Sequence, residues 1–159
     1  MFGFLTSKKE RVVSPVDGDI VELSEVPDEV FSQKMAGDGV AIIPRSNTFV
    51  APVSGVLSKI FSTNHAFSIT SDSGVEVLVH IGLDTVALNG KGFERLAQEG
   101  ERVNVGQPII TADLELIQAE GKATITPVVL NYEKRLKITM DSESSSIREG
   151  ESLMRIVLS

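Results

Sequence analysis

The apolar residues of this 159-residue chain fall in short runs, and turn-forming residues separate each run from the next. The runs are rich in β-branched side chains, because the chain has 19 Val, 13 Ile and 9 Thr against only 9 Ala. Branching at Cβ suits the pleated surface of a strand better than a helix. The runs therefore predict strands at 19–23, 40–43, 55–61, 66–70, 75–81, 108–111, 123–129, 136–139 and 153–158.

Tight-turn signals such as Ser73-Gly74 and Asn89-Gly90 occupy the gaps between these runs. Many short strands joined by polar turns predict an all-β fold, which we expect to be an antiparallel β-sandwich or barrel-sandwich. Apolar residues at helical spacing are scarce, so few and short helices are expected. These helices are predicted at 28–32, 92–98 and 114–118.

Two elements of the sequence occur twice, with similar residues in the same order. Residues 14–20 (SPVDGDI) parallel residues 51–57 (APVSGVL), and residues 103–110 parallel residues 147–154. This recurrence predicts a duplicated β-unit whose two copies pack face to face. The alternative is that Pro-Val-x-Gly is ordinary turn chemistry, which can recur without duplication.

The chain length fits a single domain, which we place at residues 14–159. Residues 1–13 are predicted to form a short flexible leader. The apolar residues 1–5 span one helical turn at most, so we expect neither a signal peptide nor membrane anchoring. No apolar run approaches the roughly 18 residues of a membrane-spanning helix. The initial Met1 favours a free protein over a segment of a larger one.

Charge and cysteine content exclude several classes of function. The chain has 22 acidic and 15 basic residues, a net charge of −7, whereas a nucleic-acid binder needs a basic face. The same charge suits a basic protein partner. The chain has no cysteine, which excludes disulfides, thiolate zinc sites, iron–sulfur clusters and cysteine nucleophiles. A cysteine-free chain fits a reducing compartment, and we expect a cytoplasmic monomer.

The chain has two histidines, His65 and His80, and histidine is the side chain that ordinarily titrates near neutrality. His80 ends an apolar strand in which Val77 and Val79 alternate onto the opposite face. A hairpin centred between residues 72 and 73 would place the two histidines almost opposite each other, about 5 Å apart. Two imidazoles at that separation would share a proton or a cation, because two charged rings repel.

A pair of neighbouring imidazoles suits more than one chemistry, and the residues alone leave the choice open. The rings could bind zinc, which would take further ligands from elsewhere. One ring could be a nucleophile while the other stabilises an incoming phosphoryl group. In a purely structural interpretation, both are satisfied polar side chains.

The segments around both histidines resemble the glucose-class IIA components of the bacterial phosphoenolpyruvate-dependent sugar phosphotransferase system. The similarity runs from about Ser14 to the C-terminus. It implies a β-sandwich and a phosphohistidine relay, which would make the chain a phosphotransferase component. The similar residues are FSTNHAF at 61–67 and SDSGVEVLVHIGLDTV at 71–86, with shorter matches at 26–31, 37–42, 51–55 and 126–129.

The resemblance implies a separate role for each histidine. His80 would accept the phosphoryl group through Nε2 from the histidine-containing phosphocarrier protein and pass it to a cysteine on the IIB domain of a sugar permease. His65 would be needed for onward donation, and Thr63 would help to hold the site. The reactive ring needs an acceptor for its Nδ1–H, and the backbone carbonyl of Gly82 is the candidate.

Seven further residues are expected to surround the histidines and to contact partners. Two carboxylates would steer basic partners, and five apolar side chains, about half of them at the surface, would keep water from the labile phosphohistidine. The structural alternatives are turn capping for the carboxylates and ordinary core packing for the apolar side chains. The seven residues are Asp28, Val30, Phe31, Phe61, Phe67, Asp84 and Val86.

The transfer itself is expected to need no cofactor. A zinc ion at His65 and His80, completed by a carboxylate of a partner, is a further expectation. The resemblance also allows regulatory targets among other proteins, and it is compatible with permeases for glucose, N-acetylglucosamine, maltose, sucrose or trehalose.

Two other functions compete with the relay. They are a zinc hydrolase on a duplicated β-scaffold and a carrier domain of the biotinyl or lipoyl type. The chain lacks the His-x-His pair of the first and the Met-Lys-Met hairpin of the second.

Overall fold

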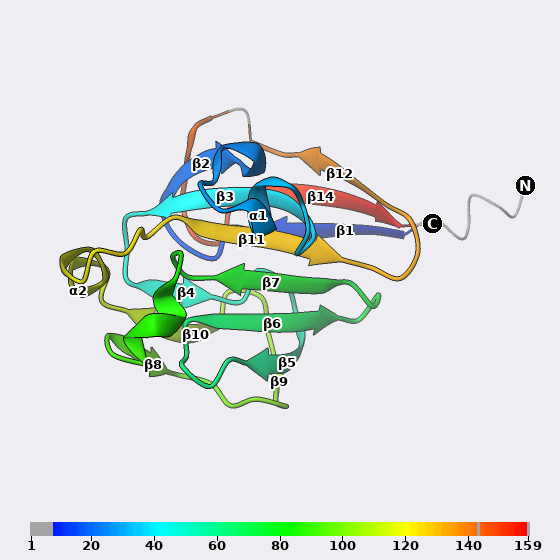
Figure 1. The fold of residues 1–159 in the computed structure, drawn as a ribbon. Helices are drawn as coiled ribbons and strands as arrows, with labels where there is room; N and C mark the ends of the chain where they lie inside the picture. Colours follow the sequence, from blue (N-terminus) through cyan, green and yellow to red (C-terminus); the bar gives the residue numbers. More distant parts are fainter. Residues whose placement is uncertain (1–7, 143, 159) are drawn as a thin grey trace, which may run out of the picture.

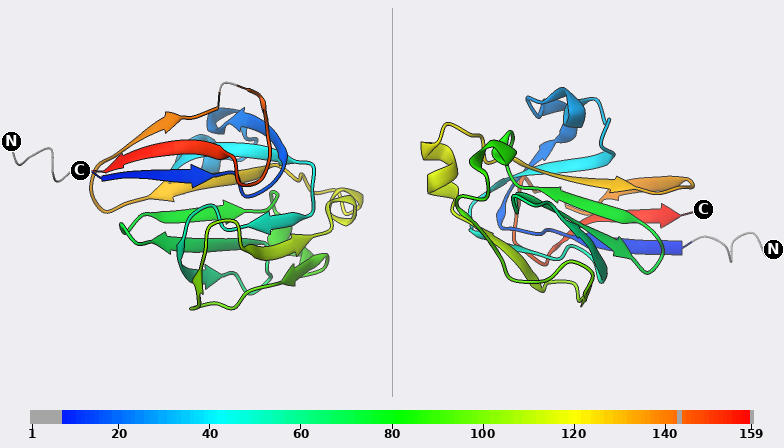
Figure 2. Two further views of the ribbon diagram at one scale, coloured as in Figure 1. Left: turned by 180° about the vertical axis from the view of Figure 1, so that it is seen from behind. Right: turned by 60° about the horizontal axis from the view of Figure 1, so that its bottom comes forward.

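A computed structural model describes residues 8–142 and 144–158 of the chain. An eight-stranded antiparallel sheet has the strand order β13-β2-β3-β11-β7-β6-β5-β9. Two three-stranded sheets, β1-β14-β12 and β4-β10-β8, lie behind it, as the view from the back shows (Figures 1 and 2). This arrangement confirms the predicted all-β sandwich.

The elements are short. The strands are Lys8–Val13 (β1), Gly18–Glu22 (β2), Asp38–Pro44 (β3), Thr48–Val50 (β4), Gly55–Ile60 (β5), Ala66–Ser71 (β6), Glu76–His80 (β7), Phe93–Arg95 (β8), Arg102–Val103 (β9), Pro108–Ala112 (β10), Thr126–Asn131 (β11), Leu136–Met140 (β12), Ser146–Ile147 (β13) and Ser152–Leu158 (β14). The helices are the 3-10 turns Leu23–Glu25 (η2) and Thr85–Leu88 (η3) and the α-helices Glu29–Ser32 (α1) and Leu114–Ala119 (α2).

One main core lies between the layers, and it is built by alternation along the strands. Val75, Val77, Val79 and Ile81 are fully buried in it, so they share one face as the sequence predicts. A smaller cluster on the outer face of the large sheet centres on Phe31 and includes Leu23, Val26, Ala41, Leu83 and Val129. This second cluster borders His80 and so helps to position the site.

The predicted duplication is confirmed by matching strand pairings. Gly18 of β2 pairs with Ile147 of β13, and its counterpart Gly55 of β5 pairs with Val103 of β9. These are the positions that the sequence repeat aligns. The large sheet accordingly consists of two matching halves, each read inward from its own edge. β13-β2-β3-β11 forms one half, and the corresponding strands β9-β5-β6-β7 form the other.

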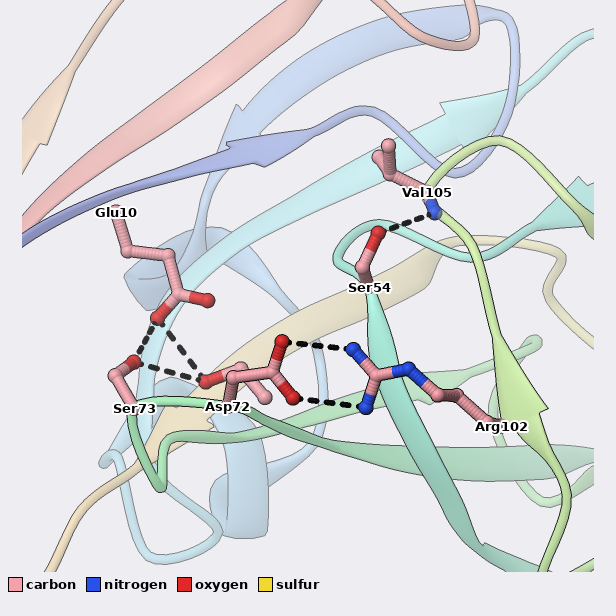
Figure 3. Close-up of polar contacts among 7 residues, drawn as sticks. Glu10, Ser54, Asp72, Ser73, Arg102 and Val105 are labelled. Carbon is pink, nitrogen blue, oxygen red and sulfur yellow. Dashed lines mark hydrogen bonds and ion pairs between the residues drawn. The ribbon is translucent and has the colours of Figure 1, made fainter.

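Hydrogen bonds of the loops repeat as well. The Val105 amide donates to Ser54 Oγ over 2.8 Å (Figure 3), and the Glu149 amide donates to Asp17 Oδ1 over the same distance. The two copies also bind each other reciprocally. Val13 N donates to Pro52 O over 2.9 Å, and Val50 N donates to Pro15 O over 2.8 Å.

The sequence predictions of the helices are confirmed at two places and wrong at one. Residues 28–32 hold α1, with Asp28 as its N-cap, and residues 114–118 lie in α2. Residues 92–98 hold no helix, because residues 93–95 form β8 and pair with β10. The Leu96 amide also donates to the Ile109 carbonyl, and the Leu96 side chain is exposed, so the apolar spacing there was coincidental.

The predicted leader is wrong for its second half. Residues 8–13 form β1, which pairs antiparallel with β14 from Lys8 opposite Leu158 to Val13 opposite Ser152. Residues 1–7 lie outside the described residues. Within the described part of the chain, no helix combines the length and the apolar character needed to cross a membrane.

Candidate functional site

His80 is the last residue of β7, and its side chain lies on the face opposite the main core. It is half-buried, and its neighbours in β7, Val79 and Val77, point the other way into the core. The strand therefore holds a rigid backbone under an imidazole that borders the surface. This confirms the face assigned from the alternation of the sequence.

Gly82 fixes the protonation of the His80 ring. The Nδ1 atom of His80 lies 2.7 Å from the carbonyl oxygen of Gly82. A carbonyl only accepts, so Nδ1 carries the proton and a neutral ring keeps its lone pair on Nε2. Gly82 has φ +76°, and a Cβ there would lie 2.6 Å from the carbonyl oxygen of Ala123, so no other residue fits this turn without strain.

His65 lies in the turn between β5 and β6 and not within a regular strand. The hairpin pairs Ala66, not His65, with His80, so the predicted register is off by one residue. His65 reaches the same place because Asn64 adopts φ +62°, which turns the chain just before β6. Thr63 Oγ1 lies 2.6 Å from His65 Nδ1 and holds the ring.

The two imidazoles are in contact. Their ring centroids are 4.9 Å apart, and the ring planes meet at 79°. Phe31 packs on His80 with centroids 5.1 Å apart, and Phe61 packs on His65 at 5.3 Å. The closeness predicted from the hairpin is therefore confirmed, and two aromatic rings shield the pair from either side.

Burial keeps both imidazoles neutral near pH 7. Burial first, and the nearby His80 ring second, together lower the pKa of His65 to about 4. Burial also lowers the pKa of His80, while the Gly82 hydrogen bond and the carboxylates of Asp28 and Asp84 oppose that effect. A neutral His80 is the form that has a free ring lone pair.

A cavity of about 290 Å³ opens beside His80, and it gathers most of the residues predicted to contact partners. Val30 and Val86 are exposed at its rim, whereas Phe31 is buried in its wall. His65 and Thr63 line a second, neighbouring cavity of about 470 Å³. The first cavity is lined by Asp28, Val30, Phe31, Ala36, Phe61, Leu78, His80, Asp84 and Val86.

Phe67 is the exception among the seven predicted contact residues. Its side chain is fully buried in the main core. Phe67 pairs with Val79, and paired residues of neighbouring strands point to the same face, which here is the face away from His80. The prediction that Phe67 contacts partners is therefore wrong.

Sequence reasoning also missed residues of the site. Leu78 lines the His80 cavity, and its alternation with His80 along β7 could have identified it. Ala36 follows α1 and carries no signal in the sequence. Lys59 and Arg95 line the cavity beside His65, and Arg95 comes from β8, the strand that was predicted as a helix.

The metal-binding prediction names two ligands, His65 and His80. Across residues 8–142 and 144–158, no three His, Cys, Asp or Glu side chains are grouped in a way that could hold a metal ion. A tetrahedral zinc site takes four ligands, so His65 and His80 would need further ligands from another molecule.

The comparisons with known proteins agree on one family. Residues 10–136 match the family model of the phosphoenolpyruvate-dependent sugar phosphotransferase system, EIIA 1. A glucose-specific EIIA component from Haemophilus influenzae is 44% identical over 156 residues, which cover 97% of this chain and 93% of the relative. One from Buchnera aphidicola of Acyrthosiphon pisum is 43% identical over 151 residues, which cover 95% and 93%.

A longer relative and a solved structure point to the same family. An N-acetylglucosamine-specific EIICBA component from Klebsiella pneumoniae is 51% identical over 120 residues, which cover 76% of this chain and 18% of that protein. The glucose permease IIA from Mycoplasma capricolum has a TM-score of 0.86 at 41% identity, covering 93% of this chain and 96% of that one. The predicted fold is thus confirmed, and so is the family resemblance seen in the residues around the histidines. The chain belongs to the EIIA 1 family of the phosphoenolpyruvate-dependent sugar phosphotransferase system and is a phosphotransferase component of the glucose class.

Proposed function

We propose that Nε2 of His80 is the atom that carries the phosphoryl group. The observation behind this assignment is the 2.7 Å contact between His80 Nδ1 and Gly82 O, which leaves the lone pair on Nε2. A new N–P bond forms at Nε2 as the bond between phosphorus and the donor breaks. The protein mainly orients the acceptor and excludes water, because phosphoryl transfer depends on the positions of the reacting groups and on stabilisation of the charge on the phosphoryl oxygens.

His65 is the stabilising ring in this proposal. Thr63 donates its hydroxyl proton to His65 Nδ1, which leaves the other ring proton on Nε2. A proton there can bond to the equatorial oxygens of a phosphoryl group on the adjacent ring, 4.9 Å away between centroids. The low pKa of His65 means that the ring acts as a neutral donor unless the dianionic phosphoryl group raises that pKa.

The partners follow from the family and the surface. The donor in our proposal is the histidine-containing phosphocarrier protein, and the acceptor is a cysteine on the IIB domain of a sugar permease. Support comes from relatives whose names join the A, B and C components in one chain. The protein would work as a cytoplasmic monomer, and regulatory targets would use the same exposed apolar rim around Val30 and Val86. Zinc would bind where a partner adds a carboxylate to the two rings.

A two-stage transfer assay tests the division of labour between the rings. The protein is labelled from phosphoenolpyruvate through the two general relay proteins, the donor is removed, and an added IIB domain discharges the label. His80→Gln should take up no label, since glutamine has no ring lone pair. His65→Gln should label to near-normal extent and discharge at least about a hundredfold more slowly, the scale of one lost transition-state donor.

Two results would contradict these roles. Substantial labelling of His80→Gln would place the phosphoryl group elsewhere. Rapid discharge of labelled His65→Gln, or its failure to label, would show that the histidines do not act separately. An acid-labile, base-stable mass increase of one phosphate on the wild type distinguishes the relay from both a hydrolase and a biotinyl or lipoyl carrier.

A further inference from the structure

The turn that carries His65 is bound by a side chain from the other sheet. Arg95, the last residue of β8, donates from Nε to Asn64 Oδ1 over 2.5 Å and from Nη2 to the carbonyl of Phe61 over 3.4 Å. Phe61 and Asn64 are the two ends of a short turn, because Asn64 N donates to Phe61 O over 2.7 Å. The guanidinium thus bridges both ends.

We propose that Arg95 is a positioning residue for His65. Asn64 is the residue directly before His65, and it holds a left-handed backbone conformation, φ +62°. A residue other than glycine in that region is strained unless its surroundings hold it, although asparagine tolerates the strain best. Arg95 restrains Asn64 through its side chain, and Thr63 on the other side restrains the His65 ring through Nδ1.

The geometry links the arginine to the ring without direct contact. Phe61 N donates to Ala66 O over 2.9 Å and closes the turn from 61 to 66, while its carbonyl accepts from Arg95. The Phe61 ring packs on His65 at 5.3 Å. Releasing Arg95 would therefore loosen Phe61 and Asn64, which flank Thr63, and Asn64 directly precedes His65.

Arginine suits this role better than lysine would. Its planar fork can donate two hydrogen bonds at fixed separation, whereas an ammonium group donates from a single point. Arg95 also belongs to β8, which pairs with β10 in the smaller sheet, so it ties the turn to a second rigid layer. Its side chain is exposed, and its removal should therefore cost the fold little.

The test follows the His65 ring directly by long-range nitrogen–proton NMR, which reports the protonation of Nδ1 and Nε2. Arg95→Met should shift the His65 ring from one tautomer toward a mixture. Arg95→Lys should recover part of the shift, and Asn64→Gly, which keeps the backbone conformation but removes the acceptor, should reproduce it. Arg102→Met is the matched control, because Arg102 bonds Asp72 at the far hairpin with both Nη atoms (Figure 3).

A kinetic measurement extends the test and rests on the proposed function. Discharge of labelled Arg95→Met to a IIB domain should slow by at least about tenfold, the scale of one hydrogen bond to a charged group, and more than labelling slows. Unchanged His65 ring signals in folded Arg95→Met, or equal shifts in Arg102→Met, would overturn the positioning role. Normal discharge of His65→Gln would instead overturn the role proposed for His65 in transfer. The NMR signals of the His65 ring would then still test whether Arg95 positions that ring.

Discussion

The lowered pKa of His65 makes the stability of the fold depend on pH. The folded ring has a pKa of about 4, against 6.5 for the ordinary side chain. Below pH 6.5 the unfolded chain therefore binds a proton that the folded chain does not, and the folded state loses stability as pH falls toward 4. The full difference is about 3 kcal/mol, and about 2 kcal/mol of it is lost between neutral pH and pH 5.

Urea denaturation of the wild type and of His65→Gln at both pH values measures this contribution. All other ionisable groups are present in both proteins, so the difference between their free energies of unfolding isolates the His65 imidazole. The wild type should lose about 2 kcal/mol more than His65→Gln on acidification to pH 5. Parallel losses in the two proteins would show that burial does not hold His65 neutral.

At the scale of elements, local sequence signals predicted what is locally determined. Alternation in β7 gave the correct face of His80, and the helix predicted at residues 28–32 is α1, which Asp28 caps through the Val30 amide. Pairings between distant segments had no such signal. Residues 8–13 were predicted as part of a short flexible leader because their partner, β14, lies at the far end of the sequence. Residues 93–95 were predicted as a helix, but they form a strand because they pair with β10.

The hairpin register shows the same limit on a finer scale. The pairing of Ala66 with His80 depends on the conformation of the Ser71 to Gly74 turn, and the predicted centre of that turn differed by half a residue. An offset of one residue moves a side chain to the other face of a strand. His65 still meets His80 because the left-handed Asn64 places it outside the regular strand.

Helix α1 is one turn long, and its Phe31 covers one side of the His80 ring. Phe31 is buried and packs on the His80 ring at 5.1 Å, and burial is the main cause of the lowered pKa of that ring. Phe31→Leu should admit water and raise the pKa of His80 toward its ordinary value. The same substitution at Phe93 of β8, which is buried in the main core, is the matched control.

Both phenylalanine variants should lose about 2 kcal/mol of stability, since each removes about three buried carbon atoms. Only Phe31→Leu should change the titration of His80, followed by NMR of the ring. The phosphohistidine of that variant should also hydrolyse faster, because water reaches it more easily. Equal His80 pKa values in the two variants would mean that α1 does not shield the ring.

At the scale of the whole molecule, the duplication explains why the site is asymmetric. The matching strand pairings make Asp38 the counterpart of His65 and Val129 the counterpart of His80. Val129 is fully buried under the cluster centred on Phe31. One copy therefore supplies the two imidazoles, and the segment inserted between β2 and β3 of the other copy supplies the cover, so neither copy could form the site alone.

The acidic rim follows from this joint construction and should govern how fast basic partners arrive. Asp28 comes from the first copy and Asp84 from the second, and both line the His80 cavity in a chain of net charge −7. Asparagine keeps the cap of α1 at position 28 and tolerates the left-handed backbone at position 84, φ +56°. The double variant Asp28→Asn/Asp84→Asn thus removes charge with little change of structure.

Association of the histidine-containing phosphocarrier protein with this double variant should be about tenfold slower at low salt, because complementary charge mainly raises the rate of encounter. Stopped-flow measurements over a range of salt concentrations would show a weaker salt dependence than for the wild type. Asp113→Asn is the matched control, since Asp113 caps α2 through the Leu116 amide but does not line the His80 cavity. If Asp113→Asn slows association equally, the effect comes from net charge alone. If the association rate changes only with substitutions at positions 28 and 84, the carboxylates beside His80 direct the encounter.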